Sequence, residues 1–294
     1  MASADNSRSP DRIVIYDIGA NNGDDLPYYL KKADRVVAVE ANPMLSKQIT
    51  ARFPEAIEQG RLVVENCVLV SDEHAAEVPF YIHRTIDLLS QFPRPDDIEA
   101  FEKVILPAKT VAALFAERGA PHFVKIDIEH YDEQILRAIF AAGFRPPFIS
   151  AEAHSIGVFA AMVALGGYDA FRLVEGSAVE DRYRAHQFVT RSGGTDVHTF
   201  SAHSAGPFGD DADGEWMTAS EFFKHLAFAG LGWKDIHATN VRIANSDVKV
   251  DPTRNAWRVI YQASPLKTGK LGASVMAARK LVARLRGRYP PAVG

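Results

Sequence analysis

The sequence predicts an α/β protein: a doubly wound, mostly parallel sheet of seven strands with helices on both faces, followed by a loop-rich C-terminal extension. Short apolar runs rich in β-branched residues alternate with helical stretches from Arg12 onward, and this alternation is typical of βαβ units. The first run ends in a loop with Gly19 and Gly23 that leads into a helix, as in parallel sheets that bind a ligand at that edge. The 294 residues are 47% hydrophobic and 24% charged, which is ordinary for a globular protein.

The elements of the first half follow from hydrophobic periodicity. The expected strands are 13–16, 35–39, 62–70, 123–128 and 148–151, with 78–83 as a hairpin partner of the third strand or an added edge strand. The expected helices are 25–33, 44–53, 111–118, 132–142 and 156–165. A loop marked by Pro93 and Pro95 precedes the helix at 111–118, because proline interrupts both strands and helices.

The second half is less regular. A sixth strand is expected at 168–174 and a helix at 219–228, and the last strand is 188–190, 235–237 or 257–261. The glycine-rich segment 193–214 is expected to form a long loop over one end of the sheet, either a lid for an acceptor or a static surface loop. His198 and His203 lie in this segment, but their spacing matches no metal motif, so we expect them to be solvated.

Charge and periodicity divide the chain into three parts: a disordered leader (1–11), a main domain (12–265) and a basic tail (266–294). The main domain has a cofactor half at about 12–150 and an acceptor or lid region at about 151–240. The tail carries seven basic and no acidic residues, and its apolar residues recur at helical spacing over 271–285, which predicts an amphipathic helix. We expect it to pack on its own acidic domain; contact with an anionic membrane surface is the alternative.

Several classes of protein are excluded by composition. Cys67 is the one cysteine, so there is no intramolecular disulfide or multi-cysteine zinc site, and a cytoplasmic location is expected. No apolar run reaches the roughly 18 residues of a membrane helix, and the leader has no signal-peptide core. The acidic body argues against nucleic-acid partners. The sequence does not indicate an oligomeric state.

The loop after the first strand carries the strongest functional signal. Its pattern is Asp-x-Gly-x-x-x-Gly, from Asp17 to Gly23, and the second strand ends in Glu40. A carboxylate at that place accepts the hydroxyls of a ribose, and an acidic loop suits a ligand with an ammonium and a sulfonium group. The pattern therefore predicts S-adenosylmethionine as cofactor. The residues expected to hold it are Asp17, Gly19, Ala20, Asn21, Gly23, Glu40, Ala41 and Asn42.

Two other functions compete with this interpretation. A dinucleotide fingerprint requires glycine at positions 21 and 24, but these are Asn21 and Asp24, and the acidic loop would repel a pyrophosphate. A nicotinamide-dependent oxidoreductase is therefore disfavoured. A non-catalytic module that keeps only the fold is the other alternative.

The same residues resemble a known family. Tyr16–Gly23 is similar to the first motif of the class I, Rossmann-like methyltransferases. The segment Phe123–Glu129, with Glu133 following, resembles the Lys-Ile-Asp-Val-Glu-Gly-x-Glu signature of the FkbM-type methyltransferases. The resemblance implies O-methylation of a hydroxyl on a sugar, polyketide or related metabolite, so that a small molecule or glycan is the acceptor.

This chain departs from the family signature at one turn. His130 and Tyr131 stand where the family has glycine and alanine, and Asp132 is added. The departure leaves the cofactor prediction intact, but it makes the turn after the fourth strand bulkier. We expect it to affect which acceptor is used.

Three polar residues at the ends of the fourth and fifth strands are the catalytic candidates: Asp127, Glu152 and His154. The carboxyl ends of neighbouring parallel strands meet at one edge of a sheet, so these side chains are expected to converge. We expect His154 to act as a base, with Asp127 orienting it or the acceptor, and no metal. In the rival scheme the three residues bind magnesium, for which a histidine is an atypical ligand.

Overall fold

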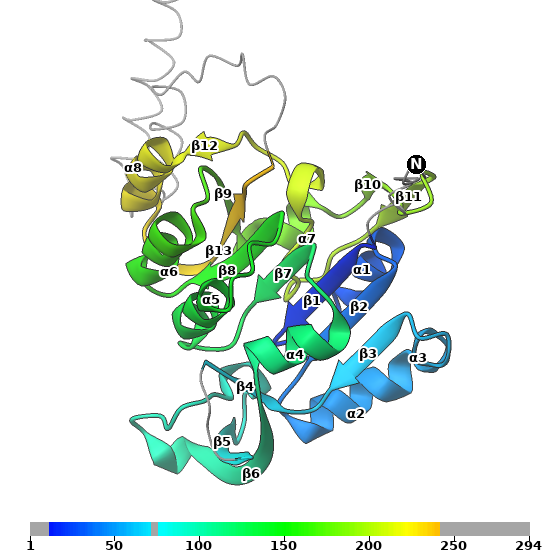
Figure 1. Ribbon diagram of the computed structural model, residues 1–294, viewed down its shortest axis with the longest axis vertical. Coiled ribbons are helices and arrows are strands. Elements are labelled where there is room, and N and C mark those ends of the chain that lie inside the picture. Colours follow the sequence, from blue (N-terminus) through cyan, green and yellow to red (C-terminus); the bar gives the residue numbers. More distant parts are fainter. Residues whose placement is uncertain (1–11, 72–75, 242–294) are drawn as a thin grey trace, which may run out of the picture. The chain divides into compact units, whose positions relative to one another are not determined.

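The computed structural model of the chain describes residues 12–71 and 76–241 (Figure 1). The expected leader, the strand candidate at 257–261 and the tail helix at 271–285 lie outside these ranges. The described residues fall into two compact units, one comprising 12–222 and 231–241 and the other comprising 223–230; the fold below is that of the first. Within the described ranges, no helix is long and apolar enough to cross a membrane.

The large sheet has eight strands and confirms the predicted fold class. Their order is β12 (Met217–Thr218), β9 (Ala170–Glu175), β13 (Gly232–Thr239), β8 (Phe148–Ala153), β7 (Phe123–Ile126), β1 (Val14–Ile18), β2 (Arg35–Val39) and β3 (Leu62–Glu65). The run from β3 to β8 is parallel, while β13 lies antiparallel between β8 and β9. Of the three candidates for the last strand, 235–237 is therefore correct, since it lies within β13. The two-residue β12 adds an eighth strand to the seven that we predicted.

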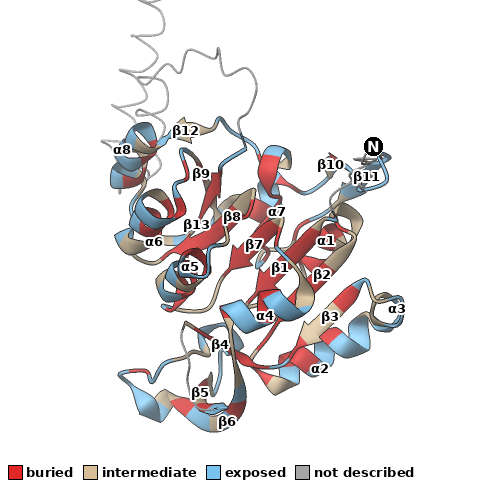
Figure 2. Cartoon of the chain, viewed as in Figure 1, coloured by how far each residue is buried: buried red, intermediate tan, exposed pale blue. Residues whose placement is uncertain are grey.

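Helices cover both faces of this sheet because successive side chains of β1 point to opposite sides. The helices of the first unit are α1 (Leu26–Lys32), α2 (Pro43–Arg52), α3 (Pro54–Glu58), α4 (Val111–Arg118), α5 (Asp132–Ala141), α6 (Ile156–Ala161) continued by η3 (Met162–Gly166), and α7 (Val179–Arg182). A further helix, α8 (Ala219–Ala229), begins in the first unit and continues into the second. Tyr16 packs edge-on against Phe115 of α4, with ring centroids 4.7 Å apart. Ile15 lies in the core cluster that contains Tyr29 of α1. The strands between these layers are almost entirely buried (Figure 2).

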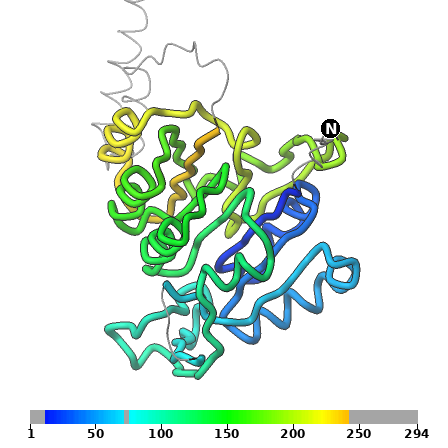
Figure 3. The backbone as a smooth tube through the Cα atoms, in the orientation of Figure 1, coloured from blue at the N-terminus to red at the C-terminus, as the bar shows by residue number. Residues whose placement is uncertain are grey.

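A second, three-stranded sheet corrects the expected third strand. The run 62–70 is two strands, β3 and β4 (Val68–Val70), and β4 pairs with β6 (Phe101–Thr110) rather than with β2. Between them, the Asn66 amide donates to the carbonyls of Glu40 and Ala41, at 2.8 and 2.9 Å, which diverts the chain from the large sheet. β5 (Glu77–His83) pairs antiparallel with β6. The sequence did not predict β6, because its charged residues and Pro107 are unusual in a strand. Figure 3 shows the chain leaving the large sheet after β3 and returning at α4.

The segment 193–214 is not the solvated loop that we expected. It begins with β11 (Thr195–His198), which forms a hairpin with β10 (His186–Val189). Phe200 and Phe208 are then buried in the core, where the ring of Phe208 stacks on Phe123 with centroids 4.1 Å apart. Aromatic burial, which outweighs the local turn signals, holds this segment against the sheet.

Candidate functional site

The loop after β1 is held against the ends of β2 and β7. The backbone N–H groups of Gly19 and Ala20 both donate to the Val39 carbonyl, at 2.9 and 3.1 Å. Gly19 has a φ of +82°, and a Cβ added there would lie 1.8 Å from the Asp127 carbonyl oxygen. Only glycine fits this position, because both the backbone angle and the close approach exclude a side chain.

Glu40, at the end of β2, is clamped by the same loop. Its two carboxylate oxygens accept hydrogen bonds from the backbone N–H groups of Asn21 (2.8 Å) and Asn42 (2.7 Å). The side chain is buried, and burial raises the pKa of Glu40 to about 7 despite these two donors. Each oxygen keeps a lone pair, so the carboxylate can still accept two further hydroxyl groups.

A pocket that is open to solvent lies beside Glu40. Five of the predicted site residues line it: Gly19, Asn21, Glu40, Ala41 and Asp127. Asp17, Ala20, Gly23, Asn42, Glu152 and His154 do not contribute to its wall. The remainder of the wall comes from positions that sequence analysis did not assign to the site: Ile18, Val39, Leu45, Cys67, Val68, Leu69, Phe80, Asp87, Leu88, Ser90, Gln91, Phe92, Ile128, Glu129 and Tyr131. Much of this wall belongs to the small sheet and the loop 87–92.

A buried lysine organises the carboxylates behind the pocket. Lys125, on β7, lies with its ammonium nitrogen 3.2 Å from Asp17, 3.5 Å from Asp127 and 3.8 Å from Asp25. Burial raises the pKa of Asp17 to about 6, and the neighbouring carboxylates hold the pKa of Lys125 well above its usual value. Lys125 therefore carries the positive charge of this group, which we name the lysine cluster: Lys125, Asp17, Asp25 and Asp127.

Asp17, which we expected to hold the cofactor through its neighbours, is not part of the pocket wall. It is fully buried and pairs with Lys125, and its Oδ2 accepts no hydrogen bond within the described residues. In the sequence, Lys125 is a lysine inside an otherwise apolar strand. A buried lysine requires carboxylate partners, and this is the signal that could have identified the cluster.

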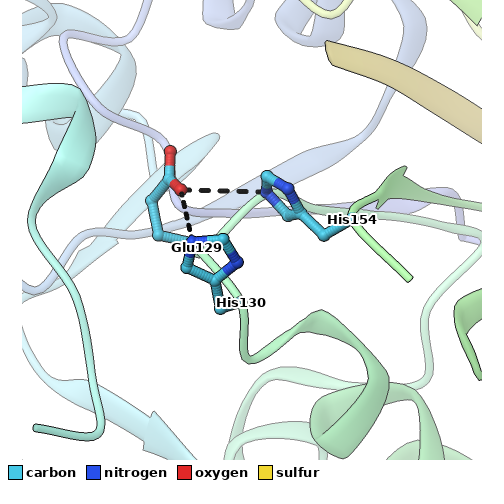
Figure 4. Close-up of side chains that lie close together, drawn as sticks. All are labelled: Glu129, His130 and His154. Carbon is cyan, nitrogen blue, oxygen red and sulfur yellow. Dashed lines mark ion pairs between the residues drawn. The ribbon is translucent and has the colours of Figure 1, made fainter. Parts of the chain in front are cut away.

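A second group of side chains lies at the ends of β7 and β8. Nε2 of His154 is 2.9 Å from Oε2 of Glu152 and 3.8 Å from Oε2 of Glu129. His130 Nε2 is 3.9 Å from the same Glu129 oxygen (Figure 4). The Glu152 carboxylate beside His154 raises the pKa of this histidine to about 9, so the imidazole is protonated at neutral pH. We name Glu129, His130, Glu152 and His154 the histidine cluster.

The predicted catalytic trio is therefore divided between the two clusters. Glu152 and His154 form a close pair, whereas Asp127 forms an ion pair with Lys125. Burial raises the pKa of Glu129 to about 7 and that of Asp132, the first residue of α5, to about 8. Glu129, His130 and Asp132 were not among the expected site residues.

The turn between β7 and α5 has an unusual backbone. His130 has a φ of +65° and Glu129 a φ of +26°, both in the left-handed region. Glycine adopts this region without strain, but a histidine there costs about 1–3 kcal/mol. The family signature has glycine at the position of His130, so this chain places an imidazole side chain where the backbone favours none.

Comparison with known families identifies the family of this chain. Residues 17–171, more than half of the chain, match the family described as methyltransferase FkbM domain. The chain belongs to the FkbM methyltransferase family. The matched range begins at Asp17 and includes the Glu40 clamp, Lys125 and the histidine cluster. No curated protein sequence matches the chain.

Several solved structures are similar to this FkbM methyltransferase. One is a precorrin-6y C5,15-methyltransferase from Geobacter metallireducens, with 13% identity, a TM-score of 0.32 and coverage of 79% of this chain and 81% of that one. Another is a spermidine synthase from Thermotoga maritima, with 11% identity, a TM-score of 0.33 and coverage of 84% and 56%. A third is an amino pentose methyltransferase from Micromonospora echinaspora bound to S-adenosylmethionine, with 12% identity, a TM-score of 0.25 and coverage of 49% and 43%.

Proposed function

We propose that this protein transfers a methyl group from S-adenosylmethionine to a hydroxyl of a small-molecule or glycan acceptor. The observation that carries the proposal is the Glu40 carboxylate, which is held by one backbone N–H on each oxygen at the wall of an open pocket. This arrangement fixes the carboxylate while leaving capacity to accept two ribose hydroxyls.

The remaining lining of the pocket also fits this cofactor. Apolar residues such as Val39, Leu45 and Phe80 offer a surface for a purine ring, and Gly19 allows the backbone to approach a ligand closely. No basic residue lines the pocket among the described residues, which disfavours a dinucleotide with its pyrophosphate. When bound, S-adenosylmethionine supplies an electrophilic methyl group on a sulfonium.

The chain's own residues must position the acceptor and receive its proton. Asp127 is the one member of the predicted trio that lines the pocket, and its side chain is 39% exposed. We therefore assign the proton acceptor role to Asp127. His154 is held protonated by Glu152, so in the metal-free protein it suits a hydrogen-bond donor to the acceptor better than the base that we expected.

The cofactor assignment is tested by Glu40→Ala. Losing a carboxylate that binds two hydroxyls costs on the order of 2–4 kcal/mol, so the Kd for S-adenosylmethionine should rise by about 100-fold in calorimetry. Glu65→Ala is the matched control, because Glu65 is a buried carboxylate at the end of the next strand that does not line the pocket. An unchanged Kd in Glu40→Ala, or binding of NADH in place of S-adenosylmethionine, would contradict the proposal.

The transfer itself is tested by the co-product. Incubation with S-adenosylmethionine and a panel of sugar and polyketide alcohols should release S-adenosylhomocysteine with at least one acceptor. Asp127→Asn should then reduce turnover by about 100-fold or more, the range expected for a general base, while the Kd for the cofactor stays within about threefold of wild type. Full turnover in Asp127→Asn would remove this residue from the chemistry.

A further inference from the structure

Three side chains of the histidine cluster meet the geometric requirement of a metal site. One candidate ligand atom from each of Glu129, His130 and His154 lies within 4.8 Å of the other two. One Glu129 oxygen faces both imidazoles, 3.8 Å from Nε2 of His154 and 3.9 Å from Nε2 of His130 (Figure 4). Metal–ligand bonds of about 2.0–2.1 Å place tetrahedral ligand atoms roughly 3.3 Å apart. The two Glu129–imidazole distances exceed this separation by about half an ångström, and the distance between the histidine nitrogens, which is at most 4.8 Å, exceeds it by no more than about 1.5 Å, so side-chain rotation would close the site.

The surroundings of these three residues also point to a missing ligand. Asp132 follows two residues after His130; it is 1% exposed, and neither of its carboxylate oxygens has a hydrogen-bond donor among the described residues. Buried polar atoms without partners are uncommon and call for an explanation.

Backbone strain at His130 also indicates that its side chain binds a ligand. His130 occupies a left-handed position where glycine would be unstrained. A strained residue persists when another interaction stabilises it, and such residues concentrate at ligand sites. A metal–imidazole bond is an interaction of the required strength, whereas the pairing of His130 with Glu129 at 3.9 Å is long and largely exposed.

We propose that Glu129, His130 and His154 bind a divalent first-row transition metal ion, with zinc as the representative ion. Two imidazoles and one carboxylate suit zinc, manganese or iron, whereas magnesium prefers oxygen ligands alone. Glu152, whose carboxylate is 2.9 Å from Nε2 of His154, is placed to complete the set as a fourth ligand. This site differs from the rival magnesium site of Asp127, Glu152 and His154, because Asp127 is engaged by Lys125.

The position of the site suggests how the ion acts. Glu129 belongs both to the metal site and to the wall of the pocket. An ion held there would bind an acceptor oxygen and lower the pKa of its hydroxyl. This use of the metal rests on the proposed function, whereas metal binding itself does not.

The test is a zinc titration of the full chain by calorimetry after treatment with a chelator. Wild type should bind one zinc ion at this site, and millimolar magnesium should not displace it. His130→Gly should weaken zinc binding by at least about 100-fold, since loss of a direct ligand should exceed the 10–100-fold cost of losing an outer-shell partner. His154→Ala should do the same. Absence of zinc binding in wild type, or an unchanged Kd in His130→Gly, would overturn the proposal.

His130→Gly also guards against misfolding as the cause of lost binding. Because glycine relieves the left-handed strain, the melting temperature of this variant in chelator should equal or exceed that of wild type. His186→Ala is the matched control: His186 lies opposite His198 across the β10–β11 hairpin, so it removes an imidazole from a histidine pair elsewhere. Its zinc affinity at the proposed site should be unchanged, and a loss there would overturn the assignment.

Measuring the affinity for S-adenosylmethionine in the same preparations separates this proposal from the proposed function. We expect His130→Gly to bind the cofactor within about threefold of wild type. Zinc binding without cofactor binding would support the metal site and contradict the methyltransferase assignment. Cofactor binding without zinc binding would do the reverse.

Discussion

The lysine cluster and the histidine cluster lie at the same edge of the sheet, but they differ in the cation that balances their carboxylates. In the lysine cluster, three carboxylates surround one buried ammonium group, and its central pair, Lys125 and Asp17, is almost fully buried. In the histidine cluster, two carboxylates face two imidazoles, and the side chains of His154 and Glu129 are each 19% exposed.

The difference separates a permanent charge from one that can be exchanged. Lysine keeps its proton when carboxylates surround it, and so the lysine cluster has a fixed composition. An imidazole can exchange its proton for a metal ion or a hydrogen-bond partner at ordinary pH. The buried Lys125, Asp17 and Asp25 are therefore suited to hold the loop and β7 together, whereas the histidine cluster and Asp127, which lines the pocket, are suited to take part in chemistry.

The largest effect is expected for Lys125→Met, which tests whether the lysine cluster stabilises the fold. Removing the ammonium leaves Asp17 and Asp25 buried without a cation, which typically costs about 3–5 kcal/mol. We expect the melting temperature to fall by roughly ten degrees, measured by circular dichroism. The double variant Lys125→Met/Asp17→Asn should recover part of the loss, because it also removes one buried charge. A loss below about 1 kcal/mol would show that the lysine cluster does not hold the fold.

Titration of His154 tests the second cluster. In chelator, its pKa should be about 9, and Glu152→Gln should lower it toward the ordinary value near 6.5, as followed by the imidazole proton resonances in NMR. The folded pKa exceeds the unfolded one, so the protonated imidazole stabilises the fold below about pH 6.5. This contribution is lost as the pH rises through about 9. A pKa near 6.5 in wild type would refute the pairing.

The smallest effect is expected where a partly exposed lysine bridges one buried and one exposed carboxylate. Lys109 lies 3.0 Å from the buried Glu65 and 2.8 Å from the exposed Glu117, so it resembles Lys125 in its contacts but not in its burial. Lys109→Met should cost less than about 1 kcal/mol in urea unfolding, because Arg118 still pairs with Glu65 at 2.6 Å and solvent screens the pair with Glu117. A cost equal to that of Lys125→Met would show that burial is not what distinguishes the two sites.

Much of the large sheet could be predicted from the sequence because its strands are buried on both faces. The strand at 35–39 and the helix at 111–118 agree residue for residue with β2 and α4. The small sheet could not be predicted, because β6 is largely exposed and its charges and Pro107 hide its strand character. The burial of 200–212 depends on aromatic contacts with residues far away in the chain, and no local pattern reports them.

The site was predictable to the extent that it depends on chain order. Gly19 and Glu40 follow successive strands, and the structure places both at the pocket. The role of Lys125, the pairing of Asp127 with it, and the raised pKa of His154 depend on distances between strands and on burial. Those distances and pKa values arise only when the chain is folded; the sequence could show that Lys125 needs a carboxylate partner, but not which carboxylates surround it.

The contact between Gly19 and Asp127 joins the two halves of the site mechanically. The loop that carries Asn21 and the turn that carries Glu129 meet there through main-chain atoms, with no room for a side chain between them. A side chain can rotate to absorb a displacement, but two touching backbones transmit it. We therefore expect that a ligand which displaces the first loop also displaces the turn that carries Glu129.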